Sequence, residues 1–188
     1  MRVIAGRARR LPLKTVEGMA TRPTTDRIKE TLFNMIQSMV PGHRFLDLYS
    51  GSGAIAIEAL SRGAREAVLV ERQPAALACI RENLKTTRLE ADARVMAADV
   101  GTALRQLDKE GAPFDIIFMD PPYDGGHERE ALQFLASSAL AGPDTVIIVE
   151  AALATDFSYL GDLGLRMERS KEYKTNKHVF ISKGELKP

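Results

Sequence analysis

The four residues Asp120-Pro-Pro-Tyr123 combine an acid, two prolines and an aromatic ring directly after an apolar run. The prolines alone would mark a turn, because proline cannot continue the hydrogen-bond ladder of a sheet. The carboxylate of Asp120 and the carbonyl oxygen of Pro121 add two acceptors, the second held rigid by its ring. Such acceptors can hydrogen-bond an exocyclic amino group and localise its lone pair, while Tyr123 stacks on a flat base. We therefore predict that Asp120, Pro121, Pro122 and Tyr123 catalyse the methylation of an amino nitrogen.

Methyl transfer of this kind depends on preorganised acceptors and close positioning, and it needs no metal ion. The histidines His43, His127 and His178 do not show the spacing of a metal-ligand set, so we expect surface or loop residues. The single cysteine, Cys79, excludes an internal disulfide and lies in an apolar helical stretch, where it is predicted to be a small core residue.

A glycine-containing segment, Asp47-Leu-Tyr-Ser-Gly-Ser-Gly53, lies where a predicted strand meets a predicted helix. Gly51 and Gly53 allow a tight turn, and the amino end of the following helix attracts an anionic group. In a dinucleotide site this loop would hold a pyrophosphate, which Asp47 would repel. S-adenosylmethionine carries a sulfonium, an ammonium and a single carboxylate instead. The loop is therefore predicted to bind S-adenosylmethionine.

Two further acids follow the next two predicted strands. Glu71 comes 20 residues after Gly51, a position that can bond the diol of a ribose in this cofactor or in a dinucleotide. Asp99 could accept a bond from the adenine amino group, although an aspartate here could equally cap a helix. The residues predicted to bind the cofactor are Asp47, Ser50, Gly51, Gly53, Glu71, Asp99 and Val100.

Short apolar strands alternate with helices through the region that must position these groups. Strands are predicted at 45–48, 67–70, 93–97, 114–119 and 145–149, and helices at 54–60, 74–85, 100–109 and 129–139. Nearly continuous apolar strands are typical of a parallel sheet buried on both faces, and their alternation with helices predicts a doubly wound, Rossmann-like α/β fold. Residues 165–171 and 178–182 are predicted to add an antiparallel pair at the sheet edge.

The amino-terminal part of the chain has a different pattern. Residues 2–5 and 10–14 could pair as a small ribbon. A helix is predicted to begin at Thr24 or Thr25 and to end at Pro41-Gly42. Its apolar stripe comprises Ile28, Leu32, Met35, Ile36 and Met39. We expect a single domain, in which residues 1–43 form a basic extension with a helix and residues 44–188 form the catalytic core.

Charge is distributed unevenly along the chain. The net charge of +1 comprises +6 in residues 1–44, +4 in residues 169–188 and −9 between them. Such asymmetry is a hint of polyanion binding, although a solvated surface explains the charge equally well. The head arginines that could contact a polyanion are Arg2, Arg7, Arg9 and Arg10. With no signal-type or membrane-spanning apolar run, we expect a cytoplasmic protein.

The two loops together, 47–53 and 120–123, resemble the class I methyltransferases that modify exocyclic amines. The segment Arg22-Pro-Thr-Thr-Asp-Arg-Ile-Lys-Glu-Thr-Leu-Phe-Asn34, with residues 2–6 and 58–63, resembles the bacterial small-subunit ribosomal RNA guanine-N2 methyltransferases of the RsmD type over nearly the full chain. The resemblance implies N2 methylation of one guanine in 16S ribosomal RNA, in the small subunit or a late precursor.

The resemblance also assigns roles to residues. It implies cofactor binding by Asp47, Gly51, Gly53, Glu71 and Asp99 and catalysis by residues 120–123, where the family often has Phe in place of Tyr123. It further implies that the segment 22–34 is a lid or faces the RNA. The polar residues that would make this contact are Arg22, Thr24 and Thr25.

Three alternatives stay open at this point. The chain could methylate DNA adenine or a protein glutamine, which similar Pro-Pro-aromatic loops do, but the basic head favours nucleic acid. It could be a non-catalytic RNA-binding assembly factor, although the intact 120–123 loop argues against that. It could be a nicotinamide-dependent oxidoreductase, against which Asp47 and the Pro-Pro loop both argue. We expect a monomer.

Overall fold

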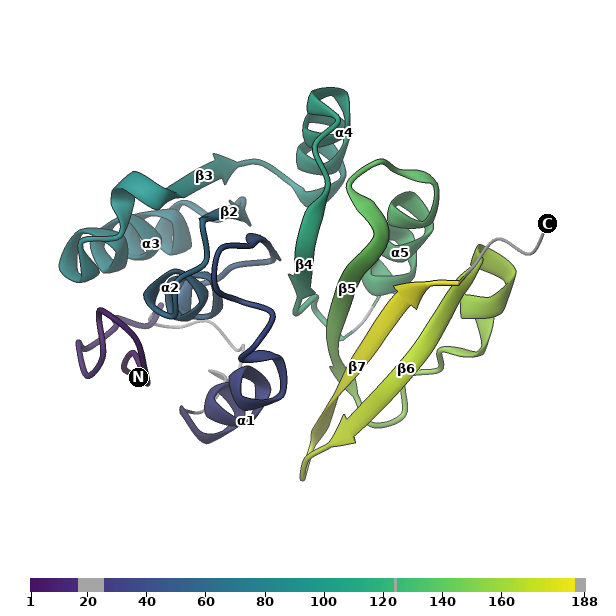
Figure 1. Cartoon of the computed structure of the whole chain (residues 1–188), viewed down its shortest axis with the longest axis horizontal. Helices are drawn as coiled ribbons and strands as arrows, with labels where there is room; N and C mark the ends of the chain where they lie inside the picture. The colour runs from purple at the N-terminus through teal and green to yellow at the C-terminus, as the bar shows by residue number, and fades with distance from the viewer. Residues whose placement is uncertain (17–25, 124, 185–188) are drawn as a thin grey trace.

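The computed structural model describes residues 1–16, 26–123 and 125–184. A seven-stranded sheet with the order β3-β2-β1-β4-β5-β7-β6 forms its centre (Figure 1). Its strands are β1 (Arg44–Leu48), β2 (Glu66–Glu71), β3 (Ala93–Ala97), β4 (Phe114–Met119), β5 (Ala141–Ala152), β6 (Leu165–Glu172) and β7 (Asn176–Lys183). The first five are parallel, and β7 is antiparallel to both β5 and β6. The predicted α/β sheet with an antiparallel carboxyl-terminal edge is confirmed.

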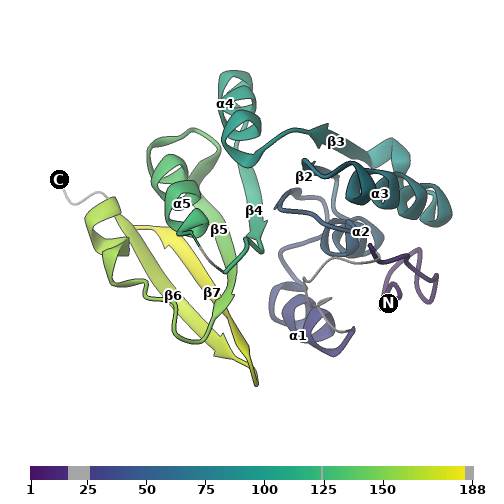
Figure 2. The ribbon, with the colours of Figure 1, turned by 180° about the vertical axis from the view of Figure 1, so that it is seen from behind.

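Helices cover both faces of this sheet (Figures 1 and 2). They are α1 (Asp26–Ile36), α2 (Ala54–Ser61), α3 (Pro74–Thr87), α4 (Val100–Glu110) and α5 (His127–Ser137), with short 3-10 helices η1 (Glu90–Asp92) and η2 (Ser158–Leu163). Alternate strand residues point to opposite faces. Phe45 and Phe118 therefore pack with α1, α2 and α3, whereas Leu46 and Ile117 pack with α4 and α5. Among the described residues, no helix has the length and apolar character needed to cross a membrane.

The amino-terminal head is a small hairpin that packs on α2. Arg2 bridges Pro12 in antiparallel fashion, as the ribbon prediction required. The backbone amides of Ile4 and Ala5 donate to the carboxylate of Glu58 at 2.8 and 3.0 Å. The apolar side chains Val3, Ala8 and Leu13 are buried in the same cluster as α2. The head is thus part of the core on this face.

Helix α1 buries only part of the predicted stripe, and it ends at Ile36, before the predicted end at Pro41-Gly42. The buried side chains are Lys29, Leu32, Phe33 and Ile36. Ile28 and Met35 are only partly buried, and Met39 lies beyond the helix end. Lys29 is fully buried because its ammonium contacts Glu58 at 3.4 Å and donates to the carbonyl oxygen of Arg2 at 2.6 Å. The predicted start of this helix at Thr24 or Thr25 lies outside the described residues.

Candidate active site

The carboxyl ends of the parallel strands meet at one edge of the sheet, where ligands bind in folds of this class. Leu48 at the end of β1 pairs with Met119 at the end of β4, and Met119 pairs with Val149 of β5. The glycine loop after β1 and the Asp120 loop after β4 therefore leave adjacent strands side by side. The structure brings together the two segments that sequence reasoning selected.

The glycine loop follows an unusual backbone path. Tyr49, Gly51 and Gly53 all have positive φ angles, of 64°, 55° and 77°. A Cβ atom at Gly53 would stand 3.0 Å from the side chain of Leu69, so packing as well as conformation requires glycine there. Apart from its two chain neighbours, no residue that the structure describes has an atom within 4 Å of the place of a Cβ at Gly51. The loop therefore leaves open space at Gly51 and tight packing at Gly53.

Asp47 is buried beneath this loop with 1% of its surface exposed. It accepts a hydrogen bond from the amide of Ala56 in α2 at 3.3 Å, and the Ser50 hydroxyl donates to its backbone carbonyl at 2.8 Å. Burial raises the pKa of the Asp47 carboxyl to about 8, and the nearby Glu71 carboxylate adds to the shift. A cation placed beside this group would favour its ionised form.

The predicted ribose-binding residue, Glu71, is buried and joined to the glycine loop. One carboxylate oxygen accepts from the amide of Gly51 at 2.9 Å, and the other accepts from Arg72 and Gln73 at 2.7 and 2.8 Å. These bonds hold the glycine loop against the turn between β2 and α3.

Asp99 has the capping role that sequence reasoning left open. It is exposed, and its carboxylate accepts from the amide of Thr102 at 2.9 Å as the N-cap of α4. This backbone bond lowers the pKa of Asp99. Val100 is the first residue of the same helix, next to the cap.

The catalytic loop begins with Asp120, which is partly buried one residue beyond β4. Burial raises the pKa of Asp120 well above its usual range, and the carboxylates of Glu150 and Asp47 raise it further. Pro121 is buried, whereas Pro122 is exposed and Tyr123 exposes 56% of its surface. The loop thus pairs an enclosed acid with an accessible aromatic ring.

A buried polar network that the sequence did not reveal lies on the next two strands. His178 contacts Glu150 through Nε2 at 3.0 Å and the Tyr173 hydroxyl through Nδ1 at 3.1 Å. The Asn176 amide donates to the other oxygen of Glu150 at 2.5 Å, and its own Oδ1 is buried with no hydrogen-bond partner among the described residues. Because Glu150 interacts electrostatically with Asp120, this network lies beside the catalytic loop.

The prediction that His178 is a surface or loop residue is wrong. The side chain has 0% of its surface exposed, because β7 places it directly opposite Glu150 of β5. His43 is exposed, and His127 lies at the start of α5 with its ring 6.4 Å from that of Tyr49. Glu150, the acid directly after the predicted strand 145–149, was the feature of the sequence that could have indicated the network. Cys79 is buried, as predicted.

The predicted RNA-contacting residues that the structure describes belong to the head hairpin and not to this edge of the sheet. Arg2 pairs with Asp26 at 3.5 Å, and Arg7 pairs with Asp92. Arg9 and Arg10 are exposed in the head hairpin, which lies below α2 and α3 at the opposite end of the molecule from β6 and β7 (Figure 1). The other three predicted contacts lie outside the described residues. These are Arg22, Thr24 and Thr25.

Comparisons with known proteins place this geometry in a family. A family model described as Conserved hypothetical protein 95 matches residues 1–181. The ribosomal RNA small subunit methyltransferase D of Escherichia coli K12 is 37% identical over 153 residues, covering 80% of this chain and 74% of that protein. The protein of the same name from Haemophilus influenzae is 32% identical, covering 80% of this chain and 78% of its own length.

Solved structures agree over almost the whole chain. The Escherichia coli protein yhhF superposes with a TM-score of 0.85 at 30% identity, covering 98% of each chain. A hypothetical protein from Thermus thermophilus gives a TM-score of 0.83 at 30% identity, covering 97% of this chain and 99% of its own. The sequence resemblance is confirmed, and the chain belongs to the Conserved hypothetical protein 95 family, the RsmD family of ribosomal RNA methyltransferases.

Proposed function

We propose that this chain acts as a monomer and transfers the methyl group of S-adenosylmethionine to the N2 amine of a guanine in 16S ribosomal RNA. The observation that carries the proposal is the position of Asp120, one residue beyond β4 and beside the glycine loop of β1. The residue that accepts a hydrogen bond from the amine and the loop that binds the cofactor follow adjacent strands. This arrangement would bring the amine nitrogen within reach of the methyl group of the cofactor. The relatives named above are small-subunit ribosomal RNA methyltransferases, which supports this class of substrate.

The residues of the glycine loop fit S-adenosylmethionine. The open space at Gly51 admits a ligand close to the backbone, and no described side chain caps the amino end of α2 at Gly53. That helix end can hold the cofactor carboxylate. The buried Asp47 suits the ammonium and the sulfonium, Glu71 suits the ribose, and Asp99 with Val100 suits the adenine. When bound, the cofactor supplies an electrophilic methyl group.

Asp120 and Pro121 would prepare the amine for attack. The Asp120 carboxylate accepts one N–H of the guanine amine and the Pro121 carbonyl oxygen accepts the other, while Tyr123 stacks on the base. As the nitrogen gains a methyl group it becomes cationic, and it must then lose a proton. The cationic cofactor would favour the ionised form of Asp120, whose raised pKa then suits its carboxylate to take that proton, and the neighbouring Glu150 and Asp47 stabilise the positive charge.

The RNA has to present this base unpaired. A guanine within a helix cannot reach Asp120, so it must leave the stack, which costs a few kcal/mol and is least costly in loops and bulges. We propose that the assembled small subunit or a late precursor holds the target in such a conformation. The basic head is proposed to contact the RNA through Arg9 and Arg10, which have no acidic partner among the described residues, and through Arg2, Arg7, Arg22, Thr24 and Thr25.

The proposal is tested by tritiated methyl transfer from S-adenosylmethionine. Purified small subunits lacking guanine-N2 methylation, naked 16S RNA and plasmid DNA are offered side by side. We expect label in RNA that digests to N2-methylguanosine. Asp120→Asn removes the proton acceptor and should lower kcat by about 10²–10³-fold while S-adenosylmethionine still binds. Label only in DNA or protein would overturn the substrate, and label by Asp120→Asn at the wild-type rate would overturn the role of Asp120.

A further inference from the structure

Strand β6 is an exposed edge strand that carries three basic residues, Arg166, Arg169 and Lys171, and two acidic ones, Glu168 and Glu172. Among the described strands it pairs with β7 alone, and of its eight residues only Leu165 is buried. Arg166, Arg169 and Lys171 lie along it, and the exposed Lys174 follows in the turn to β7. The outer side of an edge strand is available to a partner, and charged residues there also prevent unwanted strand pairing.

A register shift places the basic side chains on one face. Arg166 lies opposite Ser182, and after an irregularity between Met167 and Arg169 the pairs are Arg169 with Phe180 and Lys171 with His178. An unbroken register would put Ser170 and Glu172 on that face instead, because a slip of one residue exchanges the two faces. Bulges near functional sites often redirect side chains in this way. The irregularity thus presents Arg169 and Lys171 on the face that carries His178.

Three of these charges are available to a ligand. Arg166 is paired with Glu168 at 2.6 Å. Arg169, Lys171 and Lys174 are exposed, and among the residues that the structure describes none of them forms an ion pair. Two of the head arginines, by contrast, are already paired with Asp26 and Asp92. A polyanion would not have to displace a carboxylate to reach these three side chains.

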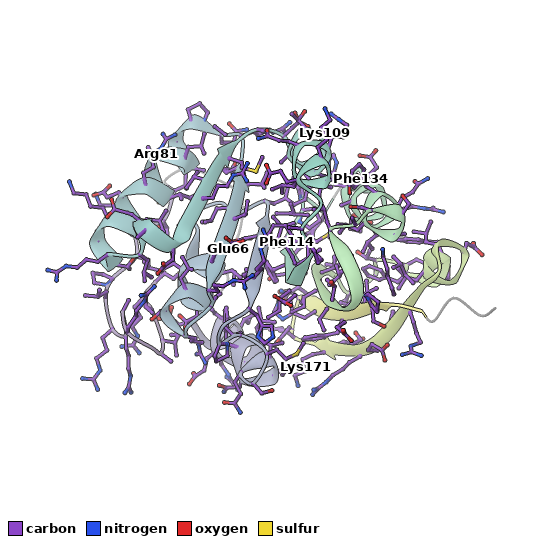
Figure 3. All side chains as sticks on the ribbon, turned by 45° about the horizontal axis from the view of Figure 1, so that its top comes forward. Glu66, Arg81, Lys109, Phe114, Phe134 and Lys171 are labelled. Atoms are coloured by element: carbon purple, nitrogen blue, oxygen red, sulfur yellow. The ribbon has the colours of Figure 1, made fainter. Side chains whose placement is uncertain are left out.

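The basic stripe of Arg169, Lys171 and Lys174 lies in line, across the sheet, with the catalytic loop. Lys171 pairs with His178, and His178 pairs with Glu150. Val149, which precedes Glu150, pairs with Met119, which precedes Asp120. Three strand spacings of about 4.8 Å give a separation of roughly 14 Å between the backbones of Lys171 and Asp120. Figure 3 shows Lys171 on β6 near α1.

We propose that Arg169, Lys171 and Lys174 form a docking surface for the phosphate backbone of the RNA substrate next to the target nucleotide. The inference rests on the proposed function, because it takes the substrate to be RNA. The acids at the strand ends repel phosphates, so a substrate that brings a base to Asp120 needs compensating positive charge nearby. The β6 stripe supplies that charge on the correct face of the sheet.

The test compares the variant Arg169→Gln/Lys171→Gln with Arg166→Gln, a control on the same strand whose charge is already paired. S-adenosylmethionine affinity and thermal melting are measured first, and both should match the wild-type chain in both variants. We then expect the double variant to raise KM for the small subunit about tenfold while kcat stays within twofold. Its slope of log affinity for RNA against log salt should be shallower by about 0.7–0.9 for each phosphate that the variant no longer neutralises.

The outcomes separate this inference from the proposed function. A wild-type chain that makes no N2-methylguanosine in RNA would overturn the proposed function and the docking surface with it. A wild-type chain that is active beside a double variant with unchanged KM and salt slope would overturn the docking surface alone. A KM increase of equal size in Arg166→Gln would also overturn it, because the effect would then not depend on the unpaired charges.

Discussion

Binding of S-adenosylmethionine should become tighter as the pH rises from 6 to 8, because Asp47 must lose a proton when a cation is placed beside it. In the free chain burial holds the pKa of this carboxyl at about 8, so it is mostly protonated at neutral pH. A neighbouring ammonium returns the pKa toward its ordinary value, since an opposite charge favours the ionised form. Binding and proton release are therefore linked.

The size of the effect follows from the distance between the working pH and a pKa of about 8. Each unit of pH below that value costs about 1.4 kcal/mol, or a factor of ten in affinity. Affinity for S-adenosylmethionine should thus be about a hundredfold lower at pH 6, and about tenfold lower at pH 7, than at high pH, where Asp47 is fully ionised. Near pH 7, about 0.9 proton should be released for each cofactor bound.

Calorimetric titration at several pH values, in two buffers of different ionisation enthalpy, measures both quantities. Asp47→Asn should abolish the dependence of cofactor affinity on pH, whereas Asp120→Asn should retain it. The two variants thus show which of the two buried acids causes the dependence. Affinity that is constant between pH 6 and 8, with no proton release, would refute the reasoning. It would mean that Asp47 does not neutralise the bound cation.

The same group affects stability with a definite sign. The folded-state pKa of Asp47 lies above the ordinary value of 3.8, so the folded chain binds the proton more tightly than the unfolded chain does. The stabilising contribution is fully present below about pH 4 and is lost as the pH rises through 8. Asp47→Asn should therefore raise the melting temperature of the cofactor-free chain at pH 8 relative to wild type, while it weakens cofactor binding.

Two further predictions concern the framework of the site. Gly53→Ala should lose about 1–3 kcal/mol more stability in urea than Gly51→Ala, because both glycines have positive φ but only the first would add overpacking; equal losses would contradict the packing argument. Glu58→Gln leaves the buried Lys29 ammonium without its carboxylate and should cost about 3–5 kcal/mol in the same assay. Glu82→Gln, which breaks an exposed pair, is the control and should cost less than about 1 kcal/mol; a loss as large as that of Glu58→Gln would contradict the burial argument.

The parallel strands could be predicted because their evidence is local. An apolar run such as 114–119 between turn signals indicates a buried strand whatever its neighbours are. The start of β5 could not be predicted in this way, since the strand begins at Ala141 and not at Thr145. The segment Ala-Gly-Pro-Asp at 141–144 has no strand propensity, and it joins the sheet through an irregular pairing with β4. Such pairing depends on tertiary context, which no local pattern contains.

The missed residues depend on partners that are distant in the chain. Lys29 is buried because Glu58 is there to receive its charge, and His178 is buried because Glu150 accepts its ring N–H. The pattern of apolar residues along a sequence cannot predict these pairs, because charged residues are assigned to the solvent-exposed face in such a pattern. The register shift in β6 is of the same kind, because it becomes visible only when β7 is in place.

The proposed reaction brings together a cationic cofactor and a polyanionic substrate, and these require opposite electrostatic fields. Asp47, Glu71, Asp120 and Glu150 lie within two residues of the carboxyl ends of adjacent strands, where burial keeps their interaction with a cation strong. A phosphate backbone would be repelled from the same place. Positive charge accordingly stands at the two ends of the molecule, in the head hairpin and on β6, so RNA can be held by its phosphates while one base alone enters the acidic region. The net charge of +1 conceals this arrangement, because +6 and +4 in the terminal segments balance −9 between them.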